Sequence, residues 1–225
     1  MVTSSFFKSK PYQLAATSSL FLLLMATGYP SALAANSSIK NSDTALFLKA
    51  DNGKTVDRYQ KTLRQHALDI QQALSTGHYA EITESIHPTR GVRFSMYGRV
   101  LPESDKVFSR AQFAQYLRES RIRFTWGAKD GTGDPLIIPL PEYLQTWVAA
   151  KDFDNTSIGV NELDQYGVYT IKNLQTIYPS SEVVEFYYNG SDEYDGMDWR
   201  ALRLVFDSYQ GRRYLVAIIN DQWTI

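Results

Sequence analysis

The sequence predicts an α+β protein in which helices come first and an antiparallel sheet ends in a long hairpin. Apolar residues recur at three- and four-residue steps between Thr55 and Gly77, as on one face of an amphipathic helix. Shorter runs of alternating apolar residues follow, bounded by Gly, Pro and Asp. The last two such runs flank Gln210-Gly211, a hairpin pattern. Helices and strands that are segregated along a chain are typical of the α+β class.

Four helices are expected. The first begins near Thr55 and stops at Gly77, and the second is shorter and ends before Pro88. Ser109 is placed to cap the third, and Pro141 suits the first position of the fourth. The apolar residues that these helices would bury are Val56, Tyr59, Leu63, Ala67, Ile70 and Leu74, then Tyr79, Ile82 and Ile86, then Phe113 and Leu117, and finally Tyr143, Leu144, Trp147 and Val148.

The strands are expected to form a meander. Pro139 limits its strand to an edge or a bulge, because proline cannot donate to a ladder. In the last strand, Leu215, Ala217 and Ile219 are expected on one face and Val216 and Ile218 on the other. Both faces of the last hairpin are therefore apolar, which predicts a central position with both faces covered. Between Asp152 and Tyr178 the pattern indicates loop, a short strand and a turn of helix. The expected strands are Val92–Met96, Ile122–Trp126, Pro135–Leu140, Val183–Tyr188, Leu202–Phe206 and Tyr214–Ile219.

The first 34 residues have the three parts of a secretory signal peptide. A basic start is followed by the apolar run Leu20–Ala26 and by the small-x-small end Ala32-Leu33-Ala34. We therefore expect a signal peptide over residues 1–34, a flexible spacer over 35–54 and a single domain over 55–225. An uncut N-terminal anchor is the alternative, although the apolar run is too short to span a bilayer.

The composition limits which cellular compartment and which classes of partner we expect. The chain has no cysteine, whereas exported eukaryotic proteins usually carry disulfides, so a bacterial periplasmic or secreted protein is the better interpretation. Loss of Lys8 and Lys10 with the signal peptide takes the net charge from −1 to −3. That charge gives no reason to expect a nucleic-acid partner, and no stable membrane span is expected after cleavage.

The order of elements resembles that of the nuclear-transport-factor-2-like superfamily, which implies a sheet curled into a cone around the long N-terminal helix. An extra helix over Ser109–Ser120 and an insert after Lys151 depart from that pattern. Four phrases are also similar to those of an uncharacterised family of exported bacterial proteins. That likeness implies the compartment and the fold but no activity. The phrases are Ile86–Ser95, Phe124–Gly131, Gly196–Trp199 and Asn220–Ile225.

The sequence lacks the common catalytic motifs and does not fit a known metal-binding motif. The chain has no thiol nucleophile, no nucleophile elbow, no H-E-x-x-H pair and no phosphate loop. The acidic turn Asp130–Asp134 suggests calcium, but on the EF-hand pattern the required Gly falls on Pro135 and the required Glu on Pro141. We therefore expect a tight turn there, with no metal and no cofactor.

If the domain has a pocket, we expect it on the concave face of the sheet, near His87 and Arg93 and walled by Trp126 and Tyr187. Aromatic walls with a few polar groups are what small-molecule sites use. For His87 a capping role beside a helix end is the alternative, and for Glu185 the solvent face of a strand is the alternative to a general base. The candidate ligand-binding residues are His87, Arg93, Tyr97, Trp126, Asp130, Glu185 and Tyr187.

Three functions are compatible with these observations. The first is a non-catalytic domain of the bacterial envelope that binds a small molecule or an envelope protein. The second is an acid–base hydrolase or isomerase that uses a cone pocket, and the third is a structural accessory protein whose core is filled by its own aromatic residues. The pocket discriminates among them, because an apolar open one favours binding, a buried carboxylate with histidine favours catalysis and a filled one favours the third.

Overall fold

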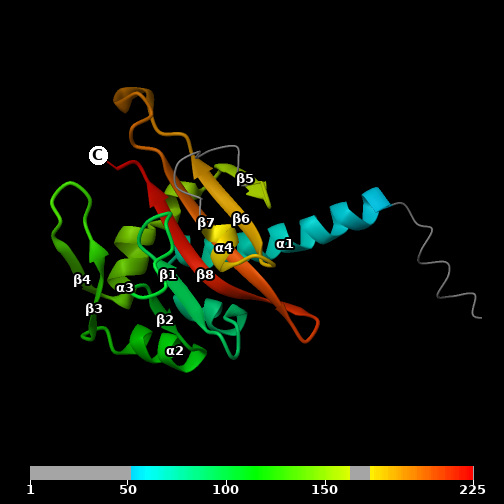
Figure 1. Ribbon diagram of the computed structural model, residues 1–225, viewed down its shortest axis with the longest axis horizontal. Helices are drawn as coiled ribbons and strands as arrows, with labels where there is room; N and C mark the ends of the chain where they lie inside the picture. Colours follow the sequence, from blue (N-terminus) through cyan, green and yellow to red (C-terminus); the bar gives the residue numbers. More distant parts are fainter. Residues whose placement is uncertain (1–51, 163–172, 225) are drawn as a thin grey trace, which may run out of the picture. The chain divides into compact units, whose positions relative to one another are not determined.

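A computed structural model describes residues 52–162 and 173–224, with side chains from Thr62 onward, and shows an α+β fold with a curved, open sheet (Figure 1). The predicted signal peptide and nearly all of the predicted spacer lie outside the described residues. The first helix begins at Asn52, inside the predicted spacer. No helix within the described ranges combines the length and the apolar character needed to cross a membrane.

Six strands form the main sheet in the order β2-β1-β8-β7-β6-β5. β1 and β8 run parallel, and the other neighbours in this sheet are antiparallel. A separate pair, β3 and β4, forms the hairpin that was predicted around the acidic turn. The bounds are β1 Val92–Ser95, β2 Lys106–Phe108, β3 Arg123–Ala128, β4 Pro135–Pro139, β5 Ser157–Val160, β6 Glu182–Tyr188, β7 Arg200–Tyr209 and β8 Arg212–Gln222.

The helices include two departures from the prediction. The second predicted helix is a 3-10 helix, η1, and the fourth continues from α3 into the π-helix η2, which ends where Ala149 takes a left-handed conformation at φ 43°. The third helix carries the predicted cap, since Ser109 and Gln112 satisfy each other's backbone N–H groups. The bounds are α1 Asn52–Ser75, η1 Tyr79–Ser85, α2 Arg110–Arg118, α3 Leu140–Glu142, η2 Tyr143–Val148, η3 Ala150–Phe153, α4 Leu174–Ile177 and η4 Asp192–Tyr194.

The C-terminal hairpin is central, as predicted, because β8 lies between β1 and β7 and β7 lies between β8 and β6. One detail of the prediction is wrong. Strict alternation would place Leu215 and Ala217 on the same face, but a bulge at Val216 makes Val205 pair with Ala217 and Phe206 with Leu215. The extra residue reverses the alternation, so Leu215 and Ala217 belong to different hydrophobic clusters.

Different secondary-structure elements cover the two faces of the main sheet. On the first face, Leu204, Phe206 and Ile218 share a core with the buried stripe of α1 and with the aromatic residues of the β3–β4 hairpin. On the second face, a smaller cluster joins the sheet to α4 and to Val100. The second-face cluster consists of Val100, Leu174, Tyr178, Val183, Val205, Val216, Ala217 and Ile219.

Candidate functional site

Trp126, predicted as a pocket wall, is part of the packed interior of the first face. Only 3% of its surface is exposed, and its ring stacks on Tyr143 with centroids 3.7 Å apart. Its indole N–H donates to the Ile138 carbonyl at 2.9 Å. Phe94 and Phe108 meet the same ring edge-on. This part of the described interior is therefore filled by the protein's own aromatic side chains.

Arg93 lies on the opposite face of the sheet from Trp126, so the predicted pocket near Arg93 does not have Trp126 as a wall. Phe94, the next residue in β1, packs on Trp126, and alternation along the strand directs Arg93 the other way. There its guanidinium donates to the Tyr178 hydroxyl at 3.2 Å and lies 3.7 Å from the Asp105 carboxylate. Burial raises the pKa of Asp105.

His87 is a packed residue that organises a turn. It is 3% exposed, and its Nδ1 accepts from the backbone N–H groups of Thr89 and Arg90 at 3.3 and 3.1 Å. Its ring packs beside Tyr209 and Tyr214. Burial, followed by the guanidinium groups of Arg90 and Arg110, lowers the pKa of His87, so the neutral ring is favoured. It caps the turn that follows η1 rather than the last carbonyls of a helix.

Glu185 is a fully buried member of an ionic triad on the second face. Its Oε2 accepts from Arg203 Nε at 2.6 Å, and Arg203 Nη1 donates to Asp221 Oδ2 at 2.7 Å. All three side chains are at most 2% exposed, and they come from the adjacent strands β6, β7 and β8. Glu185 is therefore not on a solvent-facing strand surface, contrary to that alternative.

The remaining predicted residues lie in two further places. The Tyr97 hydroxyl accepts from the Asp130 backbone N–H at 2.8 Å, which ties the exposed acidic turn to the domain. Tyr187 stacks on Trp199 with centroids 6.0 Å apart, near the end of β6. The seven residues therefore do not converge on one site. Among the described residues no group of three His, Asp or Glu side chains is arranged to hold a metal ion.

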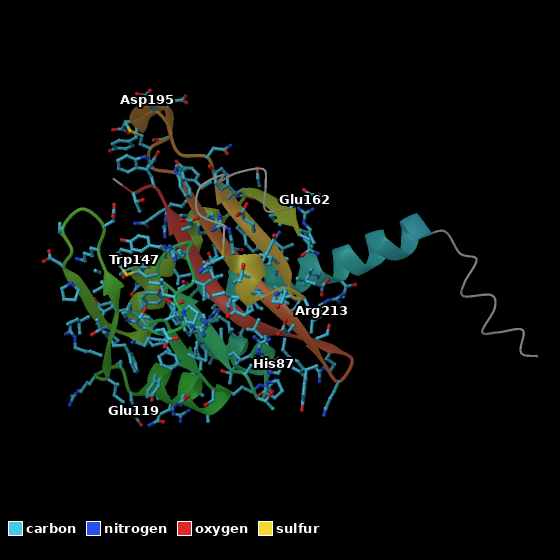
Figure 2. The ribbon with its side chains drawn as sticks, viewed as in Figure 1. His87, Glu119, Trp147, Glu162, Asp195 and Arg213 are labelled. Carbon is cyan, nitrogen blue, oxygen red and sulfur yellow. The ribbon has the colours of Figure 1, made fainter. Side chains whose placement is uncertain are left out.

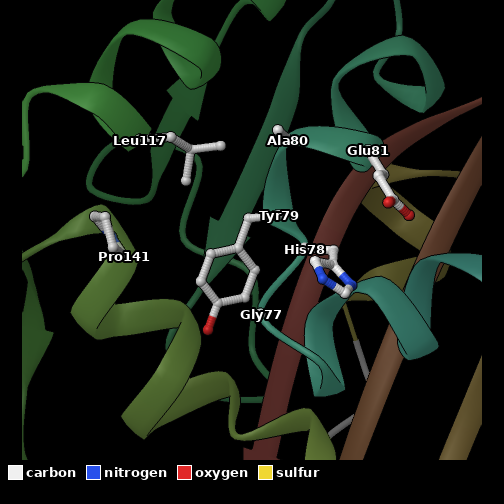
Figure 3. A pocket seen from close by; sticks show the side chains of 7 residues that line it. All are labelled: Gly77, His78, Tyr79, Ala80, Glu81, Leu117 and Pro141. Atoms are coloured by element: carbon white, nitrogen blue, oxygen red, sulfur yellow. The ribbon is translucent and has the colours of Figure 1, made fainter.

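A pocket of about 380 Å³ lies where α1 ends and η1 begins (Figure 3). Gly77, with φ 79°, lies between α1 and η1, and Tyr79 lines the pocket together with Leu117 of α2 and Pro141 of α3. Figure 3 shows the Tyr79 ring between Leu117 and Pro141 on one side and His78 on the other. The lining residues are Gly77, His78, Tyr79, Ala80, Glu81, Leu117 and Pro141.

The walls of this pocket combine apolar surface with one phenol. Tyr79 is half-buried and packs against the main core, and burial raises the pKa of its hydroxyl. A tyrosine hydroxyl is protonated at neutral pH and can donate a hydrogen bond. His78 and Glu81 are exposed, and the His78 Nδ1 is engaged by the Thr76 hydroxyl at 3.0 Å. The arrangement suits an apolar molecule that offers one hydrogen-bond acceptor.

Sequence reasoning missed this pocket although it assigned the surrounding elements. Tyr79 and Leu117 were predicted only as buried helix residues, and Pro141 only as the first residue of a helix. The Gly77 stop signal marks the turn, but the approach of Leu117 and Pro141 depends on how α2 packs against η1 and how α3 packs against α2. No protein family, curated protein or solved structure matches the chain.

Proposed function

We propose that this chain is an exported bacterial envelope protein, periplasmic or secreted, whose domain binds a small apolar ligand and is not an enzyme. The observation that carries the proposal is the open, largely apolar pocket around Tyr79. Export rests on the signal-peptide pattern of residues 1–34. A cone of the nuclear-transport-factor-2-like kind is supported by a curved, open sheet beside α1.

The chemistry of the pocket favours binding over acid–base catalysis. Leu117, Ala80 and the Pro141 ring offer surface that gains free energy when a ligand removes it from water, at about 25 cal/mol per Å². The Tyr79 hydroxyl supplies orientation. The buried groups that the enzyme hypothesis relied on are engaged elsewhere, since His87 caps a turn and Glu185 binds Arg203.

A structural accessory role is a second candidate, and one observation favours it. The stacking of Trp126 on Tyr143 fills the interior where a cone would otherwise enclose its ligand. The two proposals differ in whether the peripheral pocket around Tyr79 is ever occupied.

Titration of the full chain with Nile red, a neutral apolar dye with a carbonyl acceptor, tests the binding proposal. We expect saturable binding, a loss of about tenfold in affinity in Leu117→Glu, which puts a charge in the apolar wall, and a smaller loss in Tyr79→Phe. Tyr194→Phe is the matched control, because Tyr194 is exposed and outside the pocket. Equal dye affinity in all four proteins, with unchanged melting temperatures, would favour the accessory role.

A further inference from the structure

The tip of the β6–β7 hairpin presents large apolar side chains in an acidic setting. This acidic tip comprises residues 189–199 together with Trp223, whose backbone N–H donates to the Trp199 carbonyl at 3.1 Å. Tyr194, Met197 and Trp223 are 54%, 49% and 41% exposed. Residues 189–199 contain four carboxylates and no Lys, Arg or His. The acidic residues are Asp192, Glu193, Asp195 and Asp198.

The backbone of the acidic tip is held in place, so these apolar side chains are presented by an ordered turn. The Asp198 carboxylate accepts from both the backbone N–H and the hydroxyl of Ser191, at 2.7 and 3.0 Å. Gly190 and Gly196, with φ of 83° and 75°, approach so closely that a Cβ on Gly190 would lie 2.7 Å from the Gly196 Cα. An ordered surface pays less conformational entropy when it binds.

A second exposed apolar region lies in a basic setting. This basic end comprises residues 118–123, which join α2 to β3, together with Ile137 on β4. Ile122 and Ile137 are 37% and 43% exposed. Arg123 lies over β4 and donates from two nitrogens to the Ile137 carbonyl, at 3.1 and 2.6 Å. Arg118 and Arg121 add two exposed cations, and the single acid of the stretch, Glu119, accepts from Gln115.

We propose that the protein associates head to tail, with the acidic tip of one copy docking on the basic end of a second copy. The two surfaces are complementary in charge, and each has apolar side chains at its centre. Tyr, Trp, Met and Arg are the residue types enriched at protein interfaces. Figure 2 places Asp195 on the tip at the top of the view and Glu119 on the basic end at the bottom. Since one copy cannot join its own two ends, the contact is heterologous and a ring or a chain follows.

Charge reversal tests the pairing directly by sedimentation velocity of the full chain across a range of concentrations. The wild type should gain mass with concentration, and 0.5 M NaCl should weaken the association. Asp192→Lys/Asp195→Lys and Arg118→Glu/Arg121→Glu should each weaken it by about tenfold or more, because each places like charges opposite each other. An equimolar mixture of the two variants should associate, since the reversed tip then meets the reversed end.

A wild type that stays monomeric, or variants that associate as the wild type does, would overturn the proposal. A mixture that remains monomeric would also contradict it. The apolar contribution is tested with Trp223→Ala, which should weaken association, against Leu101→Ala, an exposed apolar residue outside both surfaces. All substituted residues are exposed, so circular dichroism should be unchanged. The test is independent of ligand binding at Tyr79.

Discussion

The two faces of the central sheet are both buried, but different interactions hold them. The first face is aromatic and aliphatic: Trp126 stacks on Tyr143, Phe94 meets both rings edge-on, and Phe206 belongs to the same cluster. The second face buries Glu185, Arg203 and Asp221 in a row across three strands. Burial alone therefore does not indicate a hydrophobic core. The stacking of Trp126 on Tyr143 should be insensitive to pH, whereas the buried carboxylates of the second face should make its stability depend on pH.

Arg203→Ala should cause the largest loss of stability. It leaves Glu185 without its partner among the described residues and places two carboxylates near each other in a buried site. Breaking a buried ion pair by removing one partner costs about 3–5 kcal/mol. Chemical denaturation at pH 7 measures the free energy of unfolding, and the deficit should shrink as the pH falls and the carboxylates take up protons.

The control replaces the whole triad. Glu185→Gln/Arg203→Met/Asp221→Asn removes the buried charges together, and replacement of complete buried ion networks is often nearly neutral. This triple variant should recover most of the stability that Arg203→Ala loses. A single variant that loses less than about 1 kcal/mol would mean that the triad is not buried as described.

Trp126→Phe tests the first face and should have a smaller effect. It removes the bond from the indole N–H to the Ile138 carbonyl and part of the stack on Tyr143. Large-to-small changes and the loss of one hydrogen bond together predict a loss of about 1–3 kcal/mol. The loss should be the same at pH 5 and pH 8. Trp223→Phe, at an exposed position, should change the free energy of unfolding by less than about 0.5 kcal/mol.

How far the sequence predicted the fold depended on the range of each interaction. The Ser109 cap, the Gln210-Gly211 turn and the central hairpin are local or pattern-based features and were predicted correctly. The bulge at Val216 was not predicted, because no residue type marks the point at which one strand of a β-ladder gains an extra residue.

The site was harder to predict because it depends on contacts between distant segments. Alternation along β6 places Glu185 and Phe186 on opposite faces, but the sequence pattern alone does not tell whether water or protein covers the face of Glu185. The answer depends on Arg203, which lies 18 residues away, and on Asp221, a further 18 residues along. The pocket likewise needs Leu117 and Pro141 to reach Tyr79.

Among the single substitutions of buried residues, Glu185→Gln should have the smallest effect at neutral pH and the most informative pH dependence. Burial is the largest influence on the Glu185 carboxyl and raises its pKa; Arg203 lowers it and Asp221 raises it. Since the folded-state pKa lies above the unfolded one, the folded protein binds more protons between the two values. Wild-type stability therefore falls as the pH rises through that window.

The glutamine variant keeps a hydrogen-bond acceptor for Arg203, which still binds Asp221, so at pH 7 its free energy of unfolding should lie within about 1 kcal/mol of the wild type. Denaturation from pH 4 to pH 8 should show the wild-type curve descending relative to the variant, since the other carboxylates titrate in both. Parallel curves would show that Glu185 titrates as it does in the unfolded chain, and that the second face is no more sensitive to pH than the first.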